Sequence, residues 1–353
     1  MPPLLGPGSI KEISLLTVFG KMPGSGRVGV CMRVKNPVVV ITGASSGIGR
    51  ATALRFARKG ARLVLAARSE EALKSVAADC RKRGGQAIAV PADVTDAGSV
   101  KELAARAVRE FGRLDVWINN AAAGVFGRIT DVPAQDFQRV LDVNISGYVN
   151  GARAALPLLR AQGSGVLINI ASVVGEISQP YTAAYSMSKA AVRALSVSIR
   201  SELRLDGLKG IEVCTVLPAA IDTPFFQHAA NYTGRRVVAM PPVYTADRVA
   251  RTIVGLVAKP CRETVVGPAA RLMVLQHKVM PGKLEATMAL QVDKSHLSRR
   301  QSSPASTGTL YEPPGGKGSV AGGWHGRRRT LQRRLMGAAV LAGTAVILRN
   351  RLG

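Results

Sequence analysis

Short runs of β-branched and other apolar residues alternate with helix-length segments along most of the chain. The runs span residues 38–41, 63–65, 87–90, 116–118, 166–170 and 213–217. This alternation is the βαβ pattern, which produces a parallel sheet covered by helices on both faces. We therefore predict an α/β fold with a doubly wound parallel sheet and right-handed connections. Helices are predicted over residues 50–59, 70–83, 99–111, 134–159, 183–205 and 246–258.

A glycine-rich turn follows the first predicted strand directly. Residues 42–49 read Thr-Gly-Ala-Ser-Ser-Gly-Ile-Gly and lead into the first predicted helix. Glycines let a backbone approach a ligand closely, and the N–H groups at a helix N-terminus favour an anion. The turn is predicted to hold the pyrophosphate of a dinucleotide; the alternative is a tight turn without a ligand. Its GxxxGxG spacing fits the widespread GxGxxG fingerprint only loosely.

Tyr185 lies one helical turn before Lys189, and Ser172 precedes both. A phenol with a pKa of about 10 is a poor acid or base at neutral pH, but a nearby lysine can favour its ionised form. The spacing alone is not specific, because Tyr232 and Tyr244 also have an arginine four positions later. Combined with the glycine turn, however, the pair indicates a proton-transfer site.

These segments together resemble the short-chain dehydrogenase/reductase (SDR) family, in the family's order and spacing. The matching segments are TGASSGIG at 42–49, ADV with Asp93, NNAA at 119–122, DVN with Asn144, NIAS with Ser172, and YSMSK at 185–189. The resemblance implies a Rossmann-like fold formed by one SDR domain over residues 37–270. The stretch 223–234 is similar to a poorly characterised bacterial subgroup of the family.

Two segments depart from the family pattern. The usual NNAG reads NNAAAG here, and the usual Pro-Gly after the sixth strand reads Pro218-Ala219. Alanine lacks glycine's freedom at positive φ, so we expect the loop beside the nicotinamide to sit slightly differently and cofactor binding to survive.

The resemblance implies a role for each catalytic residue. Tyr185 would donate a proton to the substrate carbonyl oxygen as hydride arrives from the nicotinamide. Lys189 would lower the pKa of Tyr185 and hold the nicotinamide ribose, while Ser172 would hydrogen-bond the substrate oxygen. Asn144 would hold a water that links Lys189 to solvent. Taken singly, Ser172 and Asn144 are also explained as polar residues that make local hydrogen bonds.

The choice of cofactor depends on the end of the second predicted strand. An acidic residue there would select NAD, whereas this chain has Ala66 and Ala67 followed by Arg68. A guanidinium without a competing carboxylate favours a 2′-phosphate, which predicts NADP(H); the alternative is a surface arginine. By resemblance, Asp93 contacts adenine and Thr223 the nicotinamide carboxamide. The full predicted cofactor set is Gly43, Ser45, Ser46, Gly47, Ile48, Gly49, Arg68, Asp93, Val94, Asn119, Ala121, Tyr185, Lys189, Pro218 and Thr223.

The predicted function is that of an NADP-dependent oxidoreductase that interconverts a secondary alcohol and a ketone, or a primary alcohol and an aldehyde. Residues 224–244 occupy the position of the family's variable substrate lid, and Phe225, Phe226 and Tyr232 suggest an apolar or bulky substrate. Packing of the Phe pair against the core is an equal alternative. The resemblance also implies a homodimer or homotetramer. The second functional class is an NADP-binding regulatory or scaffolding protein without significant turnover, against which the intact Ser172, Tyr185 and Lys189 argue.

Composition limits the other classes of function. The chain has 353 residues and 47% hydrophobic content, enough for one large core. Its four cysteines are widely separated without CxxC pairs, which favours small buried side chains in a reducing, cytoplasmic compartment. The four histidines lack metal-ligand spacing, so no metal site is predicted.

The positive charge is densest toward the C-terminus. Of the net charge of +26, residues 271–353 carry +11, with 14 Lys and Arg against 3 Asp and Glu. Residues 271–330 are predicted to form a basic, largely disordered extension, and residues 1–36 a disordered leader rather than a signal peptide. Residues 331–353 contain an apolar stretch, 335–348, flanked by arginines.

Three interpretations of that apolar stretch stay open. As a helix it would span about 21 Å, short of the roughly 30 Å hydrocarbon core of a bilayer. It could anchor the protein to the cytoplasmic face of an anionic membrane with the help of the arginines. It could instead be a helix that packs within the fold or at a dimer interface. Nucleic-acid binding is the least favoured, because the basic stretch contains almost no aromatic residues.

Overall fold

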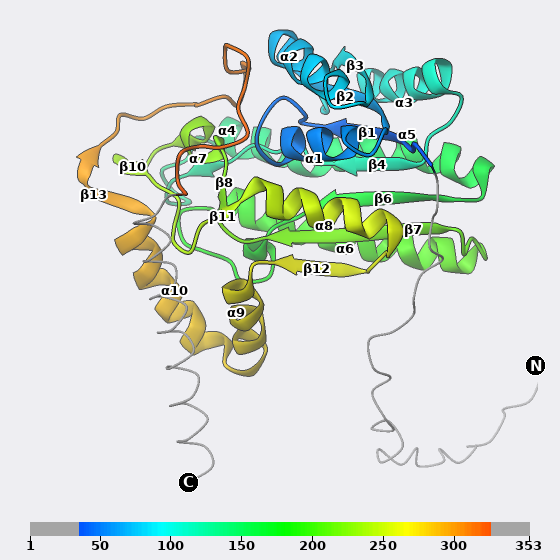
Figure 1. Ribbon diagram of the computed structural model, residues 1–353. Coiled ribbons are helices and arrows are strands. Elements are labelled where there is room, and N and C mark those ends of the chain that lie inside the picture. Colours follow the sequence, from blue (N-terminus) through cyan, green and yellow to red (C-terminus); the bar gives the residue numbers. More distant parts are fainter. Residues whose placement is uncertain (1–34, 326–353) are drawn as a thin grey trace, which may run out of the picture.

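A parallel sheet of seven strands forms the centre of the computed structural model, which describes residues 35–325 of the chain (Figure 1). Its spatial order is β12-β7-β6-β4-β1-β2-β3. The strands are β1 (Val38–Thr42), β2 (Arg62–Ala67), β3 (Gln86–Pro91), β4 (Val116–Asn119), β6 (Gly165–Ile170), β7 (Ile211–Pro218) and β12 (Glu263–Val266). The strand order reverses between β1 and β4, and ligands of such sheets bind outside the carboxyl ends of the strands at this point.

Helices cover both faces of this sheet, as predicted. One face carries α1 (Gly47–Ala57), α2 (Glu70–Arg81) and α8 (Ala246–Ala258), and the other carries α3 (Ala97–Phe111), α5 (Gly147–Gln162) and α6 (Ala183–Leu205). Alternate residues of β1 enter the two cores: Val39 and Ile41 pack under α1 and α8, while Val38 and Val40 pack on the opposite side. The fully apolar runs in the sequence reflect this burial on both faces.

The segment predicted as one helix over 134–159 is divided into three parts. It consists of α4 (Ala134–Leu141), a π-helical turn η2 (Asp142–Ser146), and α5. Single π-helical turns inside helices are frequent at functional sites. Here the turn carries Asn144, a predicted catalytic residue.

Short elements form a rim around the carboxyl ends of the strands. They are β5 (Val125–Phe126), η3 (Val173–Gly175), β8 (Ile221–Asp222), α7 (Phe225–His228), β9 (Ala230–Asn231), β10 (Arg235–Val237) and β11 (Tyr244–Thr245). Two of these pairs are parallel bridges, β5 with β9 and β8 with β11. The predicted lid region, 224–244, is therefore tied into the rim.

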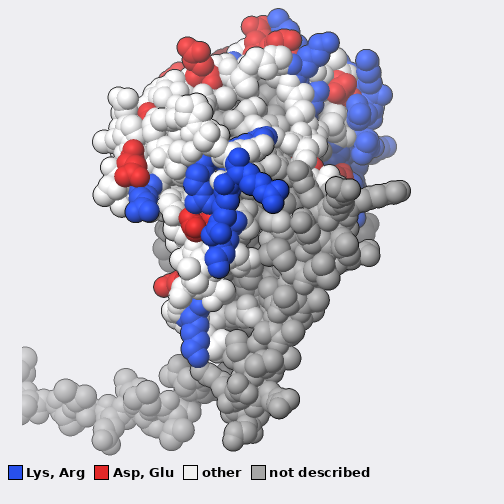
Figure 2. All heavy atoms as spheres, turned by 90° about the vertical axis from the view of Figure 1, so that its left-hand side faces the viewer, with Lys and Arg blue, Asp and Glu red and all other residues white. Residues whose placement is uncertain are grey.

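The described part of the C-terminal extension is folded, which corrects the prediction of a largely disordered stretch over 271–330. It contains α9 (Pro268–Val279), α10 (Pro281–Ser295) and β13 (Leu297–Ser302), and β13 pairs with β10. Met288 and Val292 of α10 are buried in a hydrophobic cluster. Asp293 forms an ion pair with Arg235 of β10. Figure 2 shows the face that carries β10 and β13, where exposed Arg236, Arg299 and Arg300 contribute to its positive charge.

Residues 303–325, named here the covering segment, run from β13 back across the carboxyl ends of the strands (orange to red in Figure 1). The segment has no helix or strand, yet Leu310 and Trp324 are 2% and 7% exposed. Because these two buried side chains are far apart in the sequence, the segment shows no hydrophobic periodicity. From its sequence alone it therefore resembles a disordered linker. The predicted leader up to residue 34 and the apolar stretch 335–348 lie outside the described residues. Within residues 35–325, no helix is long and apolar enough to cross a membrane.

Candidate active site

A cavity of about 740 Å³ opens at the carboxyl ends of the strands. Most of the predicted site residues lie on its wall: Gly43, Ser45, Ser46, Gly47, Ile48, Arg68, Asp93, Val94, Ala121, Ser172, Tyr185, Lys189, Pro218 and Thr223. Segments far apart in the sequence are thus brought to one edge of the sheet. Three predicted residues, Gly49, Asn119 and Asn144, are not on this wall.

The glycine turn needs its glycines for two different reasons. Gly43 has φ of 64°, and a Cβ atom there would lie 2.7 Å from the Cα of Ala121. A Cβ on Gly49 would lie 2.3 Å from the carbonyl oxygen of Gly43, so this glycine serves close packing of the turn rather than the cavity. Ser46 precedes α1 without capping it through its side chain. The first N–H groups of α1 are therefore not satisfied by that side chain.

Tyr185 stands in the first turn of α6, facing Ser172 at the end of β6. Its ring packs against Phe225 with 5.1 Å between centroids. Burial raises the pKa of Tyr185 to about 12, and a hydrogen bond with Ser172 acts in the opposite direction. The phenol is thus protonated over the neutral range, which suits a proton donor.

Lys189 is buried one turn further along α6, with 1% exposure. Its Nζ atom donates to the carbonyl oxygen of Ile170 at 2.9 Å and to the phenol oxygen of Tyr148 at 3.2 Å. It lies 5.5 Å from the centroid of the Tyr185 ring. Burial lowers the pKa of Lys189 to about 7. The lysine can therefore change its charge near neutral pH.

Sequence reasoning missed Tyr148, which joins the floor of the site. Its hydroxyl donates to the carbonyl oxygen of Ile170 at 2.8 Å and accepts from Lys189. Burial is the main cause of its raised pKa. No local pattern marks this tyrosine, because it lies within a helix whose apolar and polar residues are mixed; only its distance from Lys189 in the fold identifies it.

Asn144 and Asn119 are buried and make protein hydrogen bonds. Asn144 Oδ1 accepts from the N–H of Ala123, and Nδ2 donates to the Ala123 carbonyl at 2.9 Å and to Ser188 Oγ at 3.0 Å. Ser188 is the residue before Lys189, so Asn144 positions this part of α6; its role in holding a water stays a prediction.

Asn119 lies inside the sheet rather than on the cavity. It accepts from Trp117 Nε1 at 2.8 Å and donates to Asn169 Oδ1 at 2.9 Å. The neighbouring Asn120 lines the cavity instead, and its Nδ2 donates to the carbonyls of Thr42 and Gly43. Asn119, the last residue of β4, therefore does not line the cavity, and its predicted contact with the cofactor stays a prediction.

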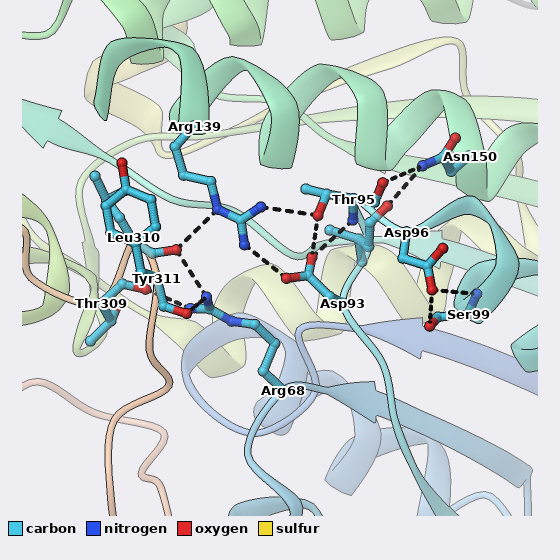
Figure 3. Close-up of polar contacts among 11 residues, drawn as sticks. Arg68, Asp93, Thr95, Asp96, Ser99, Arg139, Asn150, Thr309, Leu310 and Tyr311 are labelled. Atoms are coloured by element: carbon cyan, nitrogen blue, oxygen red, sulfur yellow. Dashed lines mark hydrogen bonds and ion pairs between the residues drawn. The ribbon is translucent and has the colours of Figure 1, made fainter. Parts of the chain in front are cut away.

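Arg68 lies at the adenosine end predicted for the cofactor, against the covering segment (Figure 3). Its guanidinium donates to the carbonyl oxygens of Thr309 at 2.5 Å, Leu310 at 2.9 Å and Tyr311 at 2.8 Å. Asp93 lies close by and binds the guanidinium of Arg139 at 2.8 Å. Burial opposes ionisation of Asp93, but hydrogen bonds from Thr95 and Arg139 outweigh it and lower the pKa of its carboxyl group.

Pro218 and Ala219 lie at the other end of the cavity, with Thr223. Among the described non-glycine residues only Asn36 and Tyr181 have positive φ, so Ala219 adopts a conformation that does not require glycine. The Thr223 carbonyl accepts from Trp324 Nε1 at 3.1 Å. The covering segment therefore reaches both ends of the cavity.

The remaining wall is largely apolar and comes from the rim and the C-terminal helices. Phe225 and Phe226 line the cavity and also pack against each other, with centroids 5.5 Å apart; the apolar substrate that they suggest stays a prediction. Tyr232 is not on the wall and hydrogen-bonds Asp136. Four methionines and two histidines also line the cavity: Met240, Met273, Met280, Met288, His228 and His296.

These residues fit a nicotinamide dinucleotide. The close backbone approach at Gly43, the start of α1, which the Ser46 side chain does not cap, and a cavity of this volume are suited to hold phosphates and an extended ligand. Tyr185, the predicted proton donor, lies on the same wall. Among residues 35–325 no group of His, Cys, Asp and Glu side chains is placed to hold a metal ion.

Comparisons with known proteins agree with this site. The family model described as short chain dehydrogenase matches residues 37–232. An uncharacterized oxidoreductase of Bacillus subtilis, YxnA, is 34% identical over 319 residues, covering 88% of this chain and 89% of the relative. Its match thus extends beyond the part that the family model covers.

Two solved structures have the same fold. A short chain dehydrogenase/reductase from Burkholderia phymatum in complex with NAD is 28% identical, with a TM-score of 0.64, covering 71% of this chain and 96% of that one. An alcohol dehydrogenase from Thermococcus sibiricus complexed with 5-hydroxy-NADP is 29% identical, with a TM-score of 0.56, covering 65% and 94%. With its parallel sheet, its glycine turn, and Tyr185 and Lys189 on the cavity wall, the chain belongs to the short-chain dehydrogenase/reductase family of oxidoreductases.

Proposed function

We propose that the protein is an NADP-dependent oxidoreductase that interconverts an alcohol and a ketone or aldehyde, with Tyr185 as the general acid and base. The observation that carries this proposal is the position of the Tyr185 phenol beside Ser172 on the cavity wall. A bound nicotinamide would supply or accept the hydride. Tyr185 would donate its proton to the carbonyl oxygen, and Ser172 would hydrogen-bond that oxygen as charge develops on it.

Lys189 would support the proton transfer from below. Its cationic form would stabilise the Tyr185 phenolate that remains after the proton is donated. The Nζ atom lies 5.5 Å from the centroid of the Tyr185 ring, and opposite charges this close attract strongly in a buried site. Its pKa of about 7 lets it take up or release a proton at neutral pH. Tyr148 and the Ile170 carbonyl hold its Nζ atom in place.

The preference for NADP is supported by Arg68. No carboxylate follows β2 at residues 66–68, and a guanidinium at this position pairs well with a 2′-phosphate. The apolar wall formed by Phe225, Phe226 and the methionines favours an apolar or bulky substrate. The protein is further proposed to act in the cytoplasm as a homodimer or homotetramer, with the stretch 335–348 attaching it to a membrane surface.

The test is oxidation of NADPH and of NADH with a panel of aldehydes and ketones of increasing apolar size, using wild type and Tyr185→Phe. We expect turnover to be faster with NADPH than with NADH and to increase with the apolar size of the carbonyl compound. It should be lost in Tyr185→Phe. Tight NADPH binding without turnover of any compound would favour the second candidate, a cofactor-binding regulatory protein. Turnover with NADH alone would overturn the NADP assignment.

A further inference from the structure

Two arginines from different elements converge on one backbone oxygen at the adenosine end. Arg68 follows β2 and Arg139 lies on α4. The Leu310 carbonyl oxygen accepts from Arg68 at 2.9 Å and from Arg139 at 3.2 Å (Figure 3). A carbonyl is a neutral acceptor, whereas two guanidinium groups directed at one point favour an anion there. The position of this oxygen is therefore suited to an anionic oxygen atom.

The charge balance around this point leaves one positive charge without a carboxylate. Asp93 forms an ion pair with Arg139. Within the described residues, the guanidinium of Arg68 donates hydrogen bonds to the carbonyls of residues 309–311. Burial lowers the pKa of Arg68, so its environment does not favour the charge that it carries. An anion at this point would offset that cost.

A second anion-binding group is also occupied by the covering segment. The N–H of Gly47, the first residue of α1, donates to the carbonyl oxygen of Ser319 at 2.8 Å. Helix N-termini favour anions for the same reason as guanidinium groups do. The segment thus places neutral oxygens on two groups that would otherwise bind phosphate. Both contacts involve backbone atoms, so they hold whatever the side chains of the segment are.

We propose that Arg139 and Arg68 together bind the 2′-phosphate of NADP, and that residues 309–311 occupy this site until the phosphate displaces them. The inference rests on the proposed NADP preference and adds Arg139, outside the cofactor set expected from the sequence, as a residue that determines specificity. Arg139 is not on the cavity wall while Leu310 is in place. NADP should therefore loosen the covering segment at this point, and NAD, which lacks the phosphate, should not.

The first experiment measures dissociation constants of NADP and NAD by calorimetry for full-length wild type and Arg139→Gln. The expected result is that the preference for NADP falls by about 10-fold, the effect of one charge-assisted hydrogen bond. Contacts to adenine are common to both cofactors and cancel in the ratio. Arg153→Gln removes an exposed positive charge on α5 and should leave the ratio unchanged. An unchanged ratio in Arg139→Gln overturns the proposal.

A double variant separates direct binding from neutralisation of Asp93. Asp93→Asn combined with Arg139→Gln removes one charge of each sign, so the net charge stays at the wild-type value. The NADP preference should stay reduced if Arg139 contacts the phosphate. If the ratio of the two dissociation constants returns to the wild-type value, Arg139 acts only by neutralising the charge of Asp93, and the proposal is wrong. A wild type that prefers NAD contradicts the proposed cofactor itself, which is a different outcome.

Hydrogen exchange provides a readout that does not depend on affinity. The N–H of Thr309 donates to the His228 carbonyl at 2.8 Å, and that of Leu310 to Thr307 at 3.2 Å. Saturating NADP should speed amide exchange at residues 307–311 relative to saturating NAD in wild type, and the difference should disappear in Arg139→Gln. Equal exchange with both cofactors in wild type, or slower exchange with NADP, would show that the segment stays in place. The proposal that the 2′-phosphate displaces residues 309–311 would then be wrong.

Discussion

The Nζ atom of Lys189 donates a hydrogen bond to the phenol oxygen of Tyr148, a residue 41 positions earlier in the chain. The contact lies entirely inside the protein, and burial is the reason for the low pKa of the lysine. A buried lysine is costly in its charged form. Lys189 therefore couples folding stability to pH as well as serving the proposed chemistry.

Stability of the cofactor-free protein should rise from about pH 7 to about pH 8.5, where cysteines of the unfolded chain begin to ionise. The folded pKa of Lys189 is about 7 and the unfolded value is about 10.4, so in this window the unfolded chain binds the extra proton. The cost of burying the lysine is fully present below the folded pKa and is relieved as pH rises. The largest slope that one group can give is about 1.4 kcal/mol per pH unit.

Lys189→Met should flatten this rise and stabilise the protein at neutral pH, as measured by urea unfolding across the window. The exposed Lys101→Met is the matched control and should keep the wild-type slope. Burial raises the pKa of the Cys80 and Cys214 thiols to about 12, so above about pH 8.5 these groups act in the opposite sense, and above about pH 10 the raised pKa values of Tyr148 and Tyr185 do so as well. If the unfolding free energy of wild type and of Lys189→Met had the same slope against pH, the lowered pKa of Lys189 would be contradicted.

Tyr185→Phe should lower turnover by a factor of about 10² to 10⁴, the usual contribution of a positioned general acid. The change removes one hydroxyl and keeps the ring packed against Phe225, so thermal stability and NADP affinity should be close to wild type. Tyr148→Phe is a useful comparison, because it removes a hydroxyl that contacts Lys189 rather than the substrate. If Tyr185→Phe kept a tenth of the wild-type rate, another group would be the proton donor.

Arg68→Ala should narrow the preference for NADP over NAD by about 10- to 100-fold. The same change removes three hydrogen bonds to the covering segment, so the absolute affinity for both cofactors can change as well. The ratio of the two dissociation constants isolates the contribution of the 2′-phosphate. Arg153→Ala is the control and should keep the wild-type ratio. If Arg68→Ala kept it too, Arg68 would bind the covering segment but not the 2′-phosphate.

Full-length protein should sediment with vesicles that contain anionic lipid, and added salt should weaken this binding. A chain that ends at His325 should stay in solution and keep its turnover, because every described cavity residue lies before that point. An earlier end, near residues 270–290, would remove parts of α10 that the core needs, including Met288 and Val292. The shortened chain could instead lose activity or change its oligomeric state while the full-length protein does not bind vesicles. In that case residues 335–348 would belong to the fold or to an interface between copies.

The sheet, most helices and the proximity of Tyr185 and Lys189 could be predicted because their signals are local. The predicted helices over 183–205 and 246–258 coincide with α6 and α8, and the apolar runs coincide with six strands of the sheet. The Tyr185–Lys189 spacing lies within one helix, and the glycine turn is one continuous stretch between β1 and α1. The edge strand β12 was missed, since Glu263–Val266 is too short to stand out as an apolar run.

The remaining features could not be predicted because they depend on contacts between distant residues. Tyr148 is identified only by its distance from Lys189. The contacts of the covering segment with Arg68 and Gly47 use backbone carbonyls, which every residue has, so composition cannot reveal them. The position of Asn119 inside the sheet depends on the direction of its side chain, which the motif around it does not specify.

Both edges of the central sheet are closed by side chains of the same chain. The outward carbonyl of Val265 in β12 accepts from Arg271 Nε at 2.9 Å, and that of Glu263 accepts from the Cys261 thiol at 3.4 Å. At the opposite edge, the Ala87 carbonyl of β3 accepts from Arg81 at 2.7 Å, and Pro91 has no N–H to offer. An incoming strand would have to displace these groups before it could pair. These contacts therefore disfavour pairing of either edge with a strand of another chain.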